Sequence, residues 1–528
     1  MWKATKIILL LILAAFVAGL MPTIIDFLSR IVVYSAERGF YLHPDFLGRM
    51  LRAFQVIKGY AWQITLIYAC VIGCIIFMEG QNPDRTILWL VTLILVPVIG
   101  VLLYLLLGPD FKSIKNRKLF RPPKVKYIDN TPFTDDKDFL IGRLLHASSG
   151  ANLTRRNRVR ILNDGEETFG AIKEALRAAK TYIHMEYYII RDDETGHEIR
   201  DILAEAVKRG VSVRVLYDAV GSWKLKRGYV KGLIDAGIQC RSFMPVSFPM
   251  FRRRMNFRNH RKIVVVDSKT AFTGGLNIGN EYLGKGPLGF WRDTHVSVEG
   301  EAVAELHKIF LRDWCMRTGE KPEDLEREVV CDDCGPEIEQ DFSGLPVIPV
   351  QVVPSSADDP WHSILQGYFA MISRARERVW ITTPYLVPGL FLMNAMTAAA
   401  MAGVDVRVIM PAKKDHFLVF WGSRGNVEPL LRAGVRVFLY KKGFVHAKSL
   451  LADDDICSVG TCNMDVRSLE INFEDQLFIY DNSVNGRLAE QYLIDLRDSE
   501  EIEITEWERR PLWQKVLEAF GRLYSAQI

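Results

Sequence analysis

One pattern occurs twice in this chain, at equivalent places in two halves that repeat each other. It consists of a His, a Lys two positions later and an Asp five positions after the Lys, followed by a Gly and an Asn. The residues are His260, Lys262, Asp267 and Asn277 in the first copy, and His446, Lys448, Asp453 and Asn463 in the second. The Asn follows the His by 17 positions in both copies. A single match would be weak evidence, but two equivalent matches indicate a duplicated domain.

The two halves also show the same order of expected helices and strands. In the first half we expect helix 171–176, strand 182–189, helix 198–209 and strands 210–217 and 236–243. In the second half we expect helix 363–376, strand 379–386, helix 391–401 and strands 403–410 and 433–440. Helices that alternate with β-branched runs predict an α/β fold with largely parallel sheets. We therefore predict two tandem lobes, 163–345 and 346–528, related by a pseudo-twofold axis, and the second lobe ends in a helix.

The spacing within each motif predicts a shared site for anions. A His and a Lys two positions apart on a strand project from the same face. Apolar residues after each Lys bury the strand, and the Gly and Asn turn the chain back towards the same end. If the lobes pair, two imidazoles, two ammonium groups and two amides meet. The alternative is two packed core histidines, which leaves the costly Lys beside each of them unexplained.

These residue types suit phosphoryl transfer. The lysines and the amides of Asn277 and Asn463 would hold the phosphate oxygens and stabilise developing charge. One neutral imidazole would attack phosphorus while the other, protonated, donates to the leaving oxygen. With an ordinary pKa near 6.5, two histidines can share these opposite states at neutral pH. Asp267 and Asp453 would orient the rings and stabilise their cations. The lysines supply positive charge, so we expect no metal and no cofactor.

The N-terminal region predicts a membrane anchor over residues 1–110. Three uncharged apolar runs lie at 7–25, 60–78 and 87–107, and about 20 apolar residues suffice to cross a bilayer. The first run is open to three interpretations: a spanning helix, an uncleaved signal-anchor or a cleaved signal peptide. Either two or three transmembrane helices result.

Basic residues predict the orientation of this anchor. The stretch 111–126 contains seven Lys or Arg residues and no acid. The connection 79–86 contains a single basic residue, Arg85. By the positive-inside rule, everything after Lys126 is cytoplasmic, at a bacterial inner membrane. We expect 111–162 to be a basic juxtamembrane linker in contact with anionic headgroups. Eight Cys in 528 residues exclude a disulfide scaffold. Cys331 and Cys334 form a lone pair, which favours a surface loop with reduced thiols over a metal or redox site.

A longer loop precedes His260 in the first half and has no counterpart before His446. It contains Phe248, Met250 and Phe251, followed by Arg252, Arg253 and Arg254. Apolar residues beside a basic cluster suit a bilayer interface with acidic lipids, so we expect these arginines to bind substrate headgroups. The alternative is an exposed loop with a solvated basic face. Glu474, after the second motif, is a further candidate to hydrogen-bond a catalytic group, and Asp293 and His295 are either similar or structural.

The motifs resemble those of the phospholipase D superfamily, and the short sequence segments around them resemble its bacterial cardiolipin synthase branch. The stretches concerned are 256–267, 272–279, 443–453 and 463–474, with Trp291-Arg-Asp-Thr-His295, Thr383-Pro-Tyr385 and the apolar hairpin. The similarity spans most of the chain. Two departures are the extra apolar run 7–25 and Leu469 in place of an expected Phe, and neither touches the candidate chemistry.

This resemblance implies a ping-pong transfer through a phosphatidyl-histidine. Two phosphatidylglycerol molecules would give cardiolipin and glycerol, with His260 as nucleophile and His446 as acid and base by analogy. The symmetric motifs leave the reverse assignment open, as they do the oligomeric state. The implied partners are phosphatidylglycerol and other anionic phospholipids, and the protein would be membrane-integral.

Three other functions remain open on sequence grounds. A phospholipase D would pass the phosphatidyl group to water or another alcohol, and the anchor does not exclude it. A nuclease is disfavoured, because the apolar spans are out of place and no base-stacking aromatic pattern accompanies a basic groove, so we expect no nucleic-acid partner. A catalytically inactive lipid-binding scaffold would have lost a motif His or Lys, and both motifs are intact.

Overall fold

The computed structural model describes residues 89, 92, 140–245, 257–321 and 344–525. The predicted spans 7–25 and 60–78, nearly all of 87–107, and Arg252, Arg253 and Arg254 lie outside these residues, as do Cys331 and Cys334. Within the described part, no helix is both long and apolar enough to cross a membrane. The chain divides into two units, 1–109 with 248–253, and 110–247 with 254–528. The account that follows concerns the second unit.

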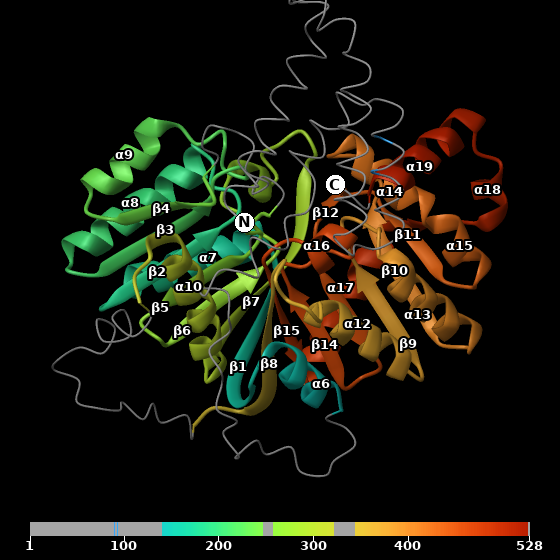
Figure 1. Cartoon of the computed structure of the whole chain (residues 1–528), viewed down its shortest axis with the longest axis horizontal. Helices are drawn as coiled ribbons and strands as arrows, with labels where there is room; N and C mark the ends of the chain where they lie inside the picture. Colours follow the sequence, from blue (N-terminus) through green and yellow to red (C-terminus); the bar gives the residue numbers. More distant parts are fainter. Residues whose placement is uncertain (1–88, 90–91, 93–139, 246–256, 322–343, 526–528) are drawn as a thin grey trace, which may run out of the picture. The chain divides into compact units, whose positions relative to one another are not determined.

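The first half contains seven strands and their covering helices in the described ranges (Figure 1). In chain order they are α6 (Leu140–Ser149), β1 (Leu153–Asp164), α7 (Gly165–Ala178), β2 (Tyr182–Tyr187), α8 (Glu194–Lys208), β3 (Ser212–Asp218), α9 (Arg227–Asp235), β4 (Gln239–Phe243), β5 (Lys262–Val266), β6 (Thr270–Gly274), the short η4 (Asn280–Leu283), β7 (Phe290–Gly300) and α10 (Ala302–Thr318).

The second half repeats this order and adds elements at its end. They are β8 (Val347–Ser355), α12 (Ser363–Arg374), β9 (Arg378–Thr382), α13 (Gly389–Met401), β10 (Asp405–Pro411), α14 (Phe417–Gly425), α15 (Val427–Arg432), β11 (Arg436–Tyr440), β12 (Gly443–Val445), β13 (Ser449–Ala452), β14 (Ile456–Gly460), α16 (Val466–Glu470), β15 (Glu474–Ile479), α17 (Asn482–Arg497), β16 (Ser499–Glu501), α18 (Ile504–Glu508) and α19 (Leu512–Ser525).

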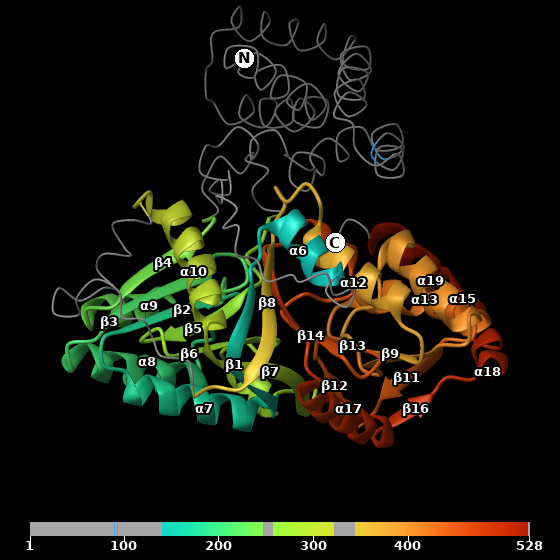
Figure 2. The ribbon, with the colours of Figure 1, turned by 90° about the horizontal axis from the view of Figure 1, so that it is seen from below.

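The strands form one sheet. Outward from its middle, equivalent strands of the two halves follow in the same order. From β8 it runs β15-β14-β13-β9-β10-β11-β16, and from β1 it runs β7-β6-β5-β2-β3-β4. Antiparallel pairing of β1 with β8 joins the halves. Each strand of the first half thus has a counterpart in the second half at the same distance from the seam, which is the predicted two-lobed α/β duplication. Figure 2 shows helices on both faces of the sheet.

The expected largely parallel sheets are wrong for the inner strands. Parallel pairing is confined to β2-β3-β4, β9-β10-β11 and the short β12 beside β7. The motif strands β5 and β13 pair antiparallel with both neighbours. The reason is a tight turn after each motif strand, where Asp267 and Asp453 have φ of 52° and 50°. Such a turn returns the chain directly beside the strand it has just left, and leaves no room for a crossover helix.

The predicted linker 111–162 needs a correction in its described part. Residues 140–149 form α6, and 153–164 form β1, the strand of the first half that lies at the seam. Residues 154, 157, 159 and 162 of β1 are buried, and Val159 and Leu162 are 2% and 0% exposed. The arginines of β1 at 155, 156, 158 and 160 occupy its other positions, so the basic run marks the solvent side of a strand. The folded first half therefore begins before the predicted residue 163.

Candidate active site

Each motif enters its strand through a segment that is bound to the other half of the molecule. Before His260, Asn259 forms a parallel bridge with Phe473, and the His260 amide donates to the Phe473 carbonyl at 2.9 Å. Before His446, β12 pairs with β7, and the His446 amide donates to the Arg292 carbonyl at 2.7 Å. The two histidines therefore both lie at the seam between the lobes.

Each imidazole bonds a carboxylate from the opposite half. Nδ1 of His260 lies 2.9 Å from Glu474, and Nδ1 of His446 lies 2.8 Å from Asp293. Both carboxylate side chains are fully buried, whereas the His side chains keep 10% and 9% exposure. A carboxylate at Nδ1 favours the tautomer with its proton there and leaves Nε2 as the reactive nitrogen. Neither imidazole is oriented by its own half alone.

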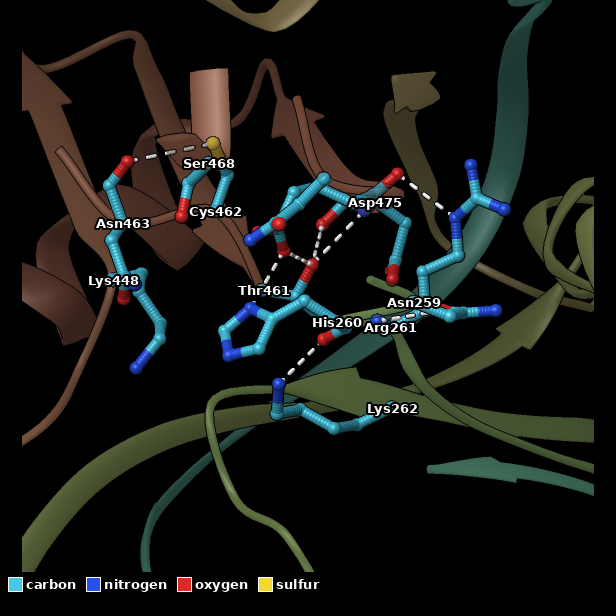
Figure 3. A network of polar contacts seen from close by, with 12 residues as sticks. Asn259, His260, Arg261, Lys262, Lys448, Thr461, Cys462, Asn463, Ser468 and Asp475 are labelled. Atoms are coloured by element: carbon cyan, nitrogen blue, oxygen red, sulfur yellow. Dashed lines mark hydrogen bonds and ion pairs between the residues drawn. The ribbon is translucent and has the colours of Figure 1, made fainter. Parts of the chain in front are cut away.

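Each motif lysine contacts the histidine of its own motif. Lys262 Nζ donates to the His260 carbonyl at 2.5 Å, and Lys448 Nζ donates to the His446 carbonyl. Figure 3 shows the ammonium group of Lys262 next to the ring of His260, and Lys448, from the other lobe, to the left of that ring. Lys448 Nζ also lies 2.8 and 3.1 Å from the two ring nitrogens of His446. Lys448 acts electrostatically on His260 and Lys262 acts on His446, so the charges of the two motifs influence each other across the seam.

Burial sets the protonation of these groups. Desolvation, opposed by Glu474 and reinforced by Lys262, lowers the pKa of His260 to about 4. Desolvation and Lys448 lower the pKa of His446 to about 4. Both rings are therefore neutral at pH 7 in the ligand-free protein, and the expected sharing of opposite states does not hold before substrate binds. Desolvation likewise lowers the pKa of Lys262 to about 7 and of Lys448 to about 8.

The motif aspartates have a different place from the one predicted. Asp267 accepts bonds from the amides of residues 180, 181 and 182 and from the Thr181 hydroxyl. Asp453 accepts bonds from the amides of residues 376, 377 and 378. Both lie at the end of the motif strand away from the histidines, where they hold the turn against the neighbouring strand. The prediction that they orient the imidazoles is wrong, because Glu474 and Asp293 occupy that position.

The predicted amide donors differ from each other in what they contact. Asn277 is engaged in packing: its oxygen accepts from the Ile189 amide at 3.1 Å and its nitrogen lies 3.0 Å from the Tyr282 hydroxyl. The Asn463 side-chain oxygen is buried without a hydrogen-bond partner in the described part of the structure. Asn463 is thus the better placed of the two to respond to a ligand.

The sequence analysis missed part of the site. Asp293 was only one of several possible supporting residues, although Asp293 on β7 and Glu474 on β15 lie on equivalent strands of the two halves. Aromatic rings flank both histidines: Tyr188 packs edge-on to His260 at 4.9 Å, and Tyr385 to His446 at 6.5 Å between ring centroids. Thr461 donates to Glu474 at 2.7 Å. In the first half the equivalent residue is Gly275, where an added Cβ would lie 1.8 Å from Asp293.

A buried polar network supports the first motif but not the second. Asn259 bonds Glu186 and Asp313, and Arg261 bonds Asp313 and the Glu474 carbonyl at 3.0 Å (Figure 3). The residues equivalent to Asn259 and Arg261 in the second motif are Val445 and Ala447, which belong to the apolar core. The residues on either side of His260 are therefore held by a charged network, and those on either side of His446 by apolar packing. The two halves of the site are not chemically equivalent.

Comparison with known families places this site. The family described as "Cardiolipin synthase, PLD-like domain" matches residues 172–314 and 368–495. A protein named cardiolipin synthase 2 from Bacillus anthracis is 42% identical over 478 residues, covering 87% of this chain and 90% of that protein. The chain belongs to the cardiolipin synthase family of the phospholipase D superfamily. A cardiolipin synthase from Halalkalibacterium halodurans is 39% identical, with 92% and 96% of the two chains covered.

Two further matches concern the fold and the N-terminal region. The crystal structure of phosphatidylserine synthase from Haemophilus influenzae superposes with a TM-score of 0.57 at 16% identity, covering 74% of this chain and all of that one. This likeness supports the two-lobed fold. A family described as "Phospholipase_D-nuclease N-terminal" matches residues 65–109. The resemblance and the enzyme class predicted from the sequence, a phosphatidyltransferase, are confirmed by the family membership.

Proposed function

We propose that this cardiolipin synthase family member transfers a phosphatidyl group from one phosphatidylglycerol to another through a histidine-linked intermediate. The observation that supports it most is the arrangement of two intact His–Lys sets, each completed by a carboxylate from the opposite lobe. In this proposal the two sets supply a nucleophile, an acid and two cations to one phosphate group. Phosphoryl transfer needs in-line groups on both sides of phosphorus and positive charge for its oxygens.

The first step forms the intermediate. Nε2 of His260 attacks the phosphorus of the donor lipid, and the bond to the headgroup glycerol oxygen breaks. His446 gives that oxygen its proton, so glycerol departs neutral. The bound phosphate anion and Asp293 both favour a charged imidazole, so the pKa of His446 rises from its ligand-free value when substrate binds. Lys262 and Lys448 hold the non-bridging oxygens.

The second step completes the transfer. His446, now neutral, takes the proton from a headgroup hydroxyl of the second phosphatidylglycerol. The resulting oxygen attacks phosphorus, and the bond to His260 breaks. The products are cardiolipin and glycerol, and both histidines return to their starting states. Exclusion of water at this stage decides between synthesis and hydrolysis.

The assignment of roles rests on the difference between the two imidazoles. Nε2 of His260 has no hydrogen-bond partner among the described residues, whereas Nε2 of His446 lies 3.1 Å from Lys448. A lone pair that is free of donors is the better nucleophile. Glu474 also accepts from Thr461 and from Asn472, at 2.7 and 3.2 Å, which fixes it behind His260.

We further propose an inner-membrane setting with the catalytic body in the cytoplasm. The supporting observations are the apolar runs 7–25, 60–78 and 87–107 and the basic stretch 111–126. The match of 65–109 to an N-terminal family segment accords with a hairpin there. We retain Arg252, Arg253 and Arg254 as proposed headgroup contacts.

Purified full-length protein given labelled phosphatidylglycerol should convert it mainly to cardiolipin and glycerol. Resolution of the lipid products, with and without added phosphatidylethanolamine, tests the proposal directly. The second lipid shows whether the acceptor has to be phosphatidylglycerol. Predominant phosphatidic acid would mean that water is the acceptor and that the protein works as a phospholipase D.

The pH dependence of kcat/KM should be bell-shaped with an early alkaline limb. At low pH, activity rises as His260 loses its proton near pH 4. At high pH, activity falls for two reasons. His446 has to be protonated when substrate binds although its ligand-free pKa is about 4, and the lysines lose their protons near 7 for Lys262 and near 8 for Lys448, which removes charge that binds phosphate. Lys262→Arg keeps its charge, so it should move the alkaline limb upward even if its rate is lower. An alkaline limb near pH 10 in the unmodified protein would contradict this.

A further inference from the structure

The C-terminal helix α19 is oriented with its apolar face outward. Its carboxylate Glu518 is 2% exposed and bonds Arg510 at 2.7 Å, with Arg424 at 3.4 Å. By contrast, the exposed fractions of Leu512, Trp513 and Val516 are 77%, 57% and 58%. A helix on a soluble protein normally shows the opposite pattern. This orientation implies that something apolar covers the outer face.

Close packing fixes α19 in this orientation. The helix lies beside α14 at the outer edge of the second lobe (Figures 1 and 2). An added Cβ at Gly521 would lie 2.5 Å from the Gly422 nitrogen, and one at Gly425 would lie 2.8 Å from the Glu518 carbonyl. Neither glycine could carry a side chain without separating the helices. The ion pairs of Glu518 and this backbone contact together prevent α19 from turning its apolar face inward.

The exposed face is connected to the active site through ring contacts and the loop before α14. Tyr385, whose ring lies 6.5 Å from that of His446, donates to Asp415 in the loop before α14. Phe417, the first residue of α14, is 50% exposed. Its ring lies 6.3 Å from Trp421, whose ring lies 5.8 Å from that of Trp513. The apolar face and His446 are therefore linked by two sets of ring contacts, which the short segment from Asp415 to Phe417 connects.

Positive charge accompanies the apolar side chains. Lys413 and Lys414 are exposed in the same loop, and Lys414 Nζ lies 6.0 Å from the Phe417 ring centroid. Lys515 is exposed on α19. Tryptophan beside lysine, with aliphatic side chains alongside, is the composition that binds the boundary between acyl chains and anionic headgroups.

We propose that this surface docks the catalytic body onto a bilayer of anionic phospholipid beside the active site. We call it the α14–α19 surface and define it as Phe417, Leu512, Trp513 and Val516, with Lys413, Lys414 and Lys515. It rests on the proposed function, because a two-chain lipid donor must present its phosphate to His446 while its acyl chains remain in an apolar phase. Docking there lets the lipid pass from bilayer to site without crossing water.

The first test compares aggregated with dissolved substrate. Full-length protein is reconstituted into phosphatidylglycerol and phosphatidylcholine vesicles, with Leu512, Trp513 and Val516 all changed to Gln. We expect cardiolipin formation to fall about tenfold or more, because three side chains no longer enter the interface. In detergent-free solution, transfer from dissolved short-chain phosphatidylglycerol should stay within about twofold. The control Ile494→Gln alters a 47% exposed apolar residue on α17, and both rates should remain.

The outcomes are distinguishable. Unchanged vesicle activity in the triple variant, or an equal loss on both substrates, would overturn the docking surface. The second test places an environment-sensitive fluorophore on Val516→Cys in reconstituted full-length protein, with Ile494→Cys and the unaltered chain as controls. We expect quenching by nitroxide-labelled headgroups at position 516 only.

Absence of that quenching, or a crosslink from position 516 to a second copy of the chain, would overturn the proposal in favour of a protein interface. Quenching together with no cardiolipin from the unaltered chain would instead count against the proposed function alone.

Discussion

His260→Ala should lower cardiolipin formation by at least about 10³-fold, because it removes the nitrogen that forms the intermediate. His446→Ala should be similarly inactive in turnover but for a different reason. It keeps the nucleophile and lacks the base that activates the acceptor. With a labelled donor whose leaving group needs little protonation, His446→Ala should therefore accumulate a phosphoryl-protein adduct, and His260→Ala should not. Acid-labile label on the denatured chain is the measurement.

The geometry makes this a sharp test of the two roles. His260 has Nε2 free of donors and a carboxylate fixed by Thr461, whereas His446 has Lys448 at its Nε2. An adduct in His260→Ala but not in His446→Ala would reverse the assignment. Label on neither variant, with activity retained in one of them, would reject a histidine intermediate. The control is His197→Ala, an exposed residue paired with Asp192 at the start of α8, which should leave turnover unchanged.

The repeat was sufficient to predict which lysines and histidines meet, for a simple physical reason. His260 and Lys262 are two apart on a strand, and the duplication supplies an identical pair that only a shared seam can bring alongside. The expected strands in both halves were also confirmed, since short β-branched runs between helices rarely permit another structure. Pairing direction was predicted wrongly, because it depends on the turn at Asp267 and not on strand composition, and β1 fell within the predicted linker.

The orienting carboxylates were harder to find for a reason that lies in the topology. Within either motif the nearest acid in sequence is the Asp, and spacing alone suggests that it serves the His. The fold places that Asp at the far end of the strand and brings in Asp293 and Glu474 across the seam. No periodicity within one half encodes a contact between halves. A comparison of the two halves beyond the motif would have helped, since Asp293 and Glu474 lie on equivalent strands, β7 and β15, next to the seam strands β1 and β8.

Glu474→Gln should lower kcat by roughly 10²–10⁴-fold with little loss of folded protein. The amide presents an N–H or a weak acceptor to Nδ1 of His260, so the ring loses its enforced tautomer and the cation of the transition state loses its counter-charge. Asp293→Asn should act likewise on His446. The pH profile separates this from a structural effect. Removing the carboxylate that raises the pKa of His260 should lower that pKa further, which moves the acid limb of kcat/KM to lower pH.

Asp267→Asn is the matched control, because it makes the same chemical change at the motif residue that does not contact an imidazole. Asparagine tolerates the positive φ of 52° at this turn, so the backbone should keep its course. Loss of charge from an acceptor of several backbone amides should cost about 2 kcal/mol of unfolding free energy. Thermal unfolding should therefore shift while kcat and the acid limb stay in place. A kcat loss in Asp267→Asn as large as that in Glu474→Gln would show that the motif aspartate, rather than the carboxylate across the seam, governs the histidine.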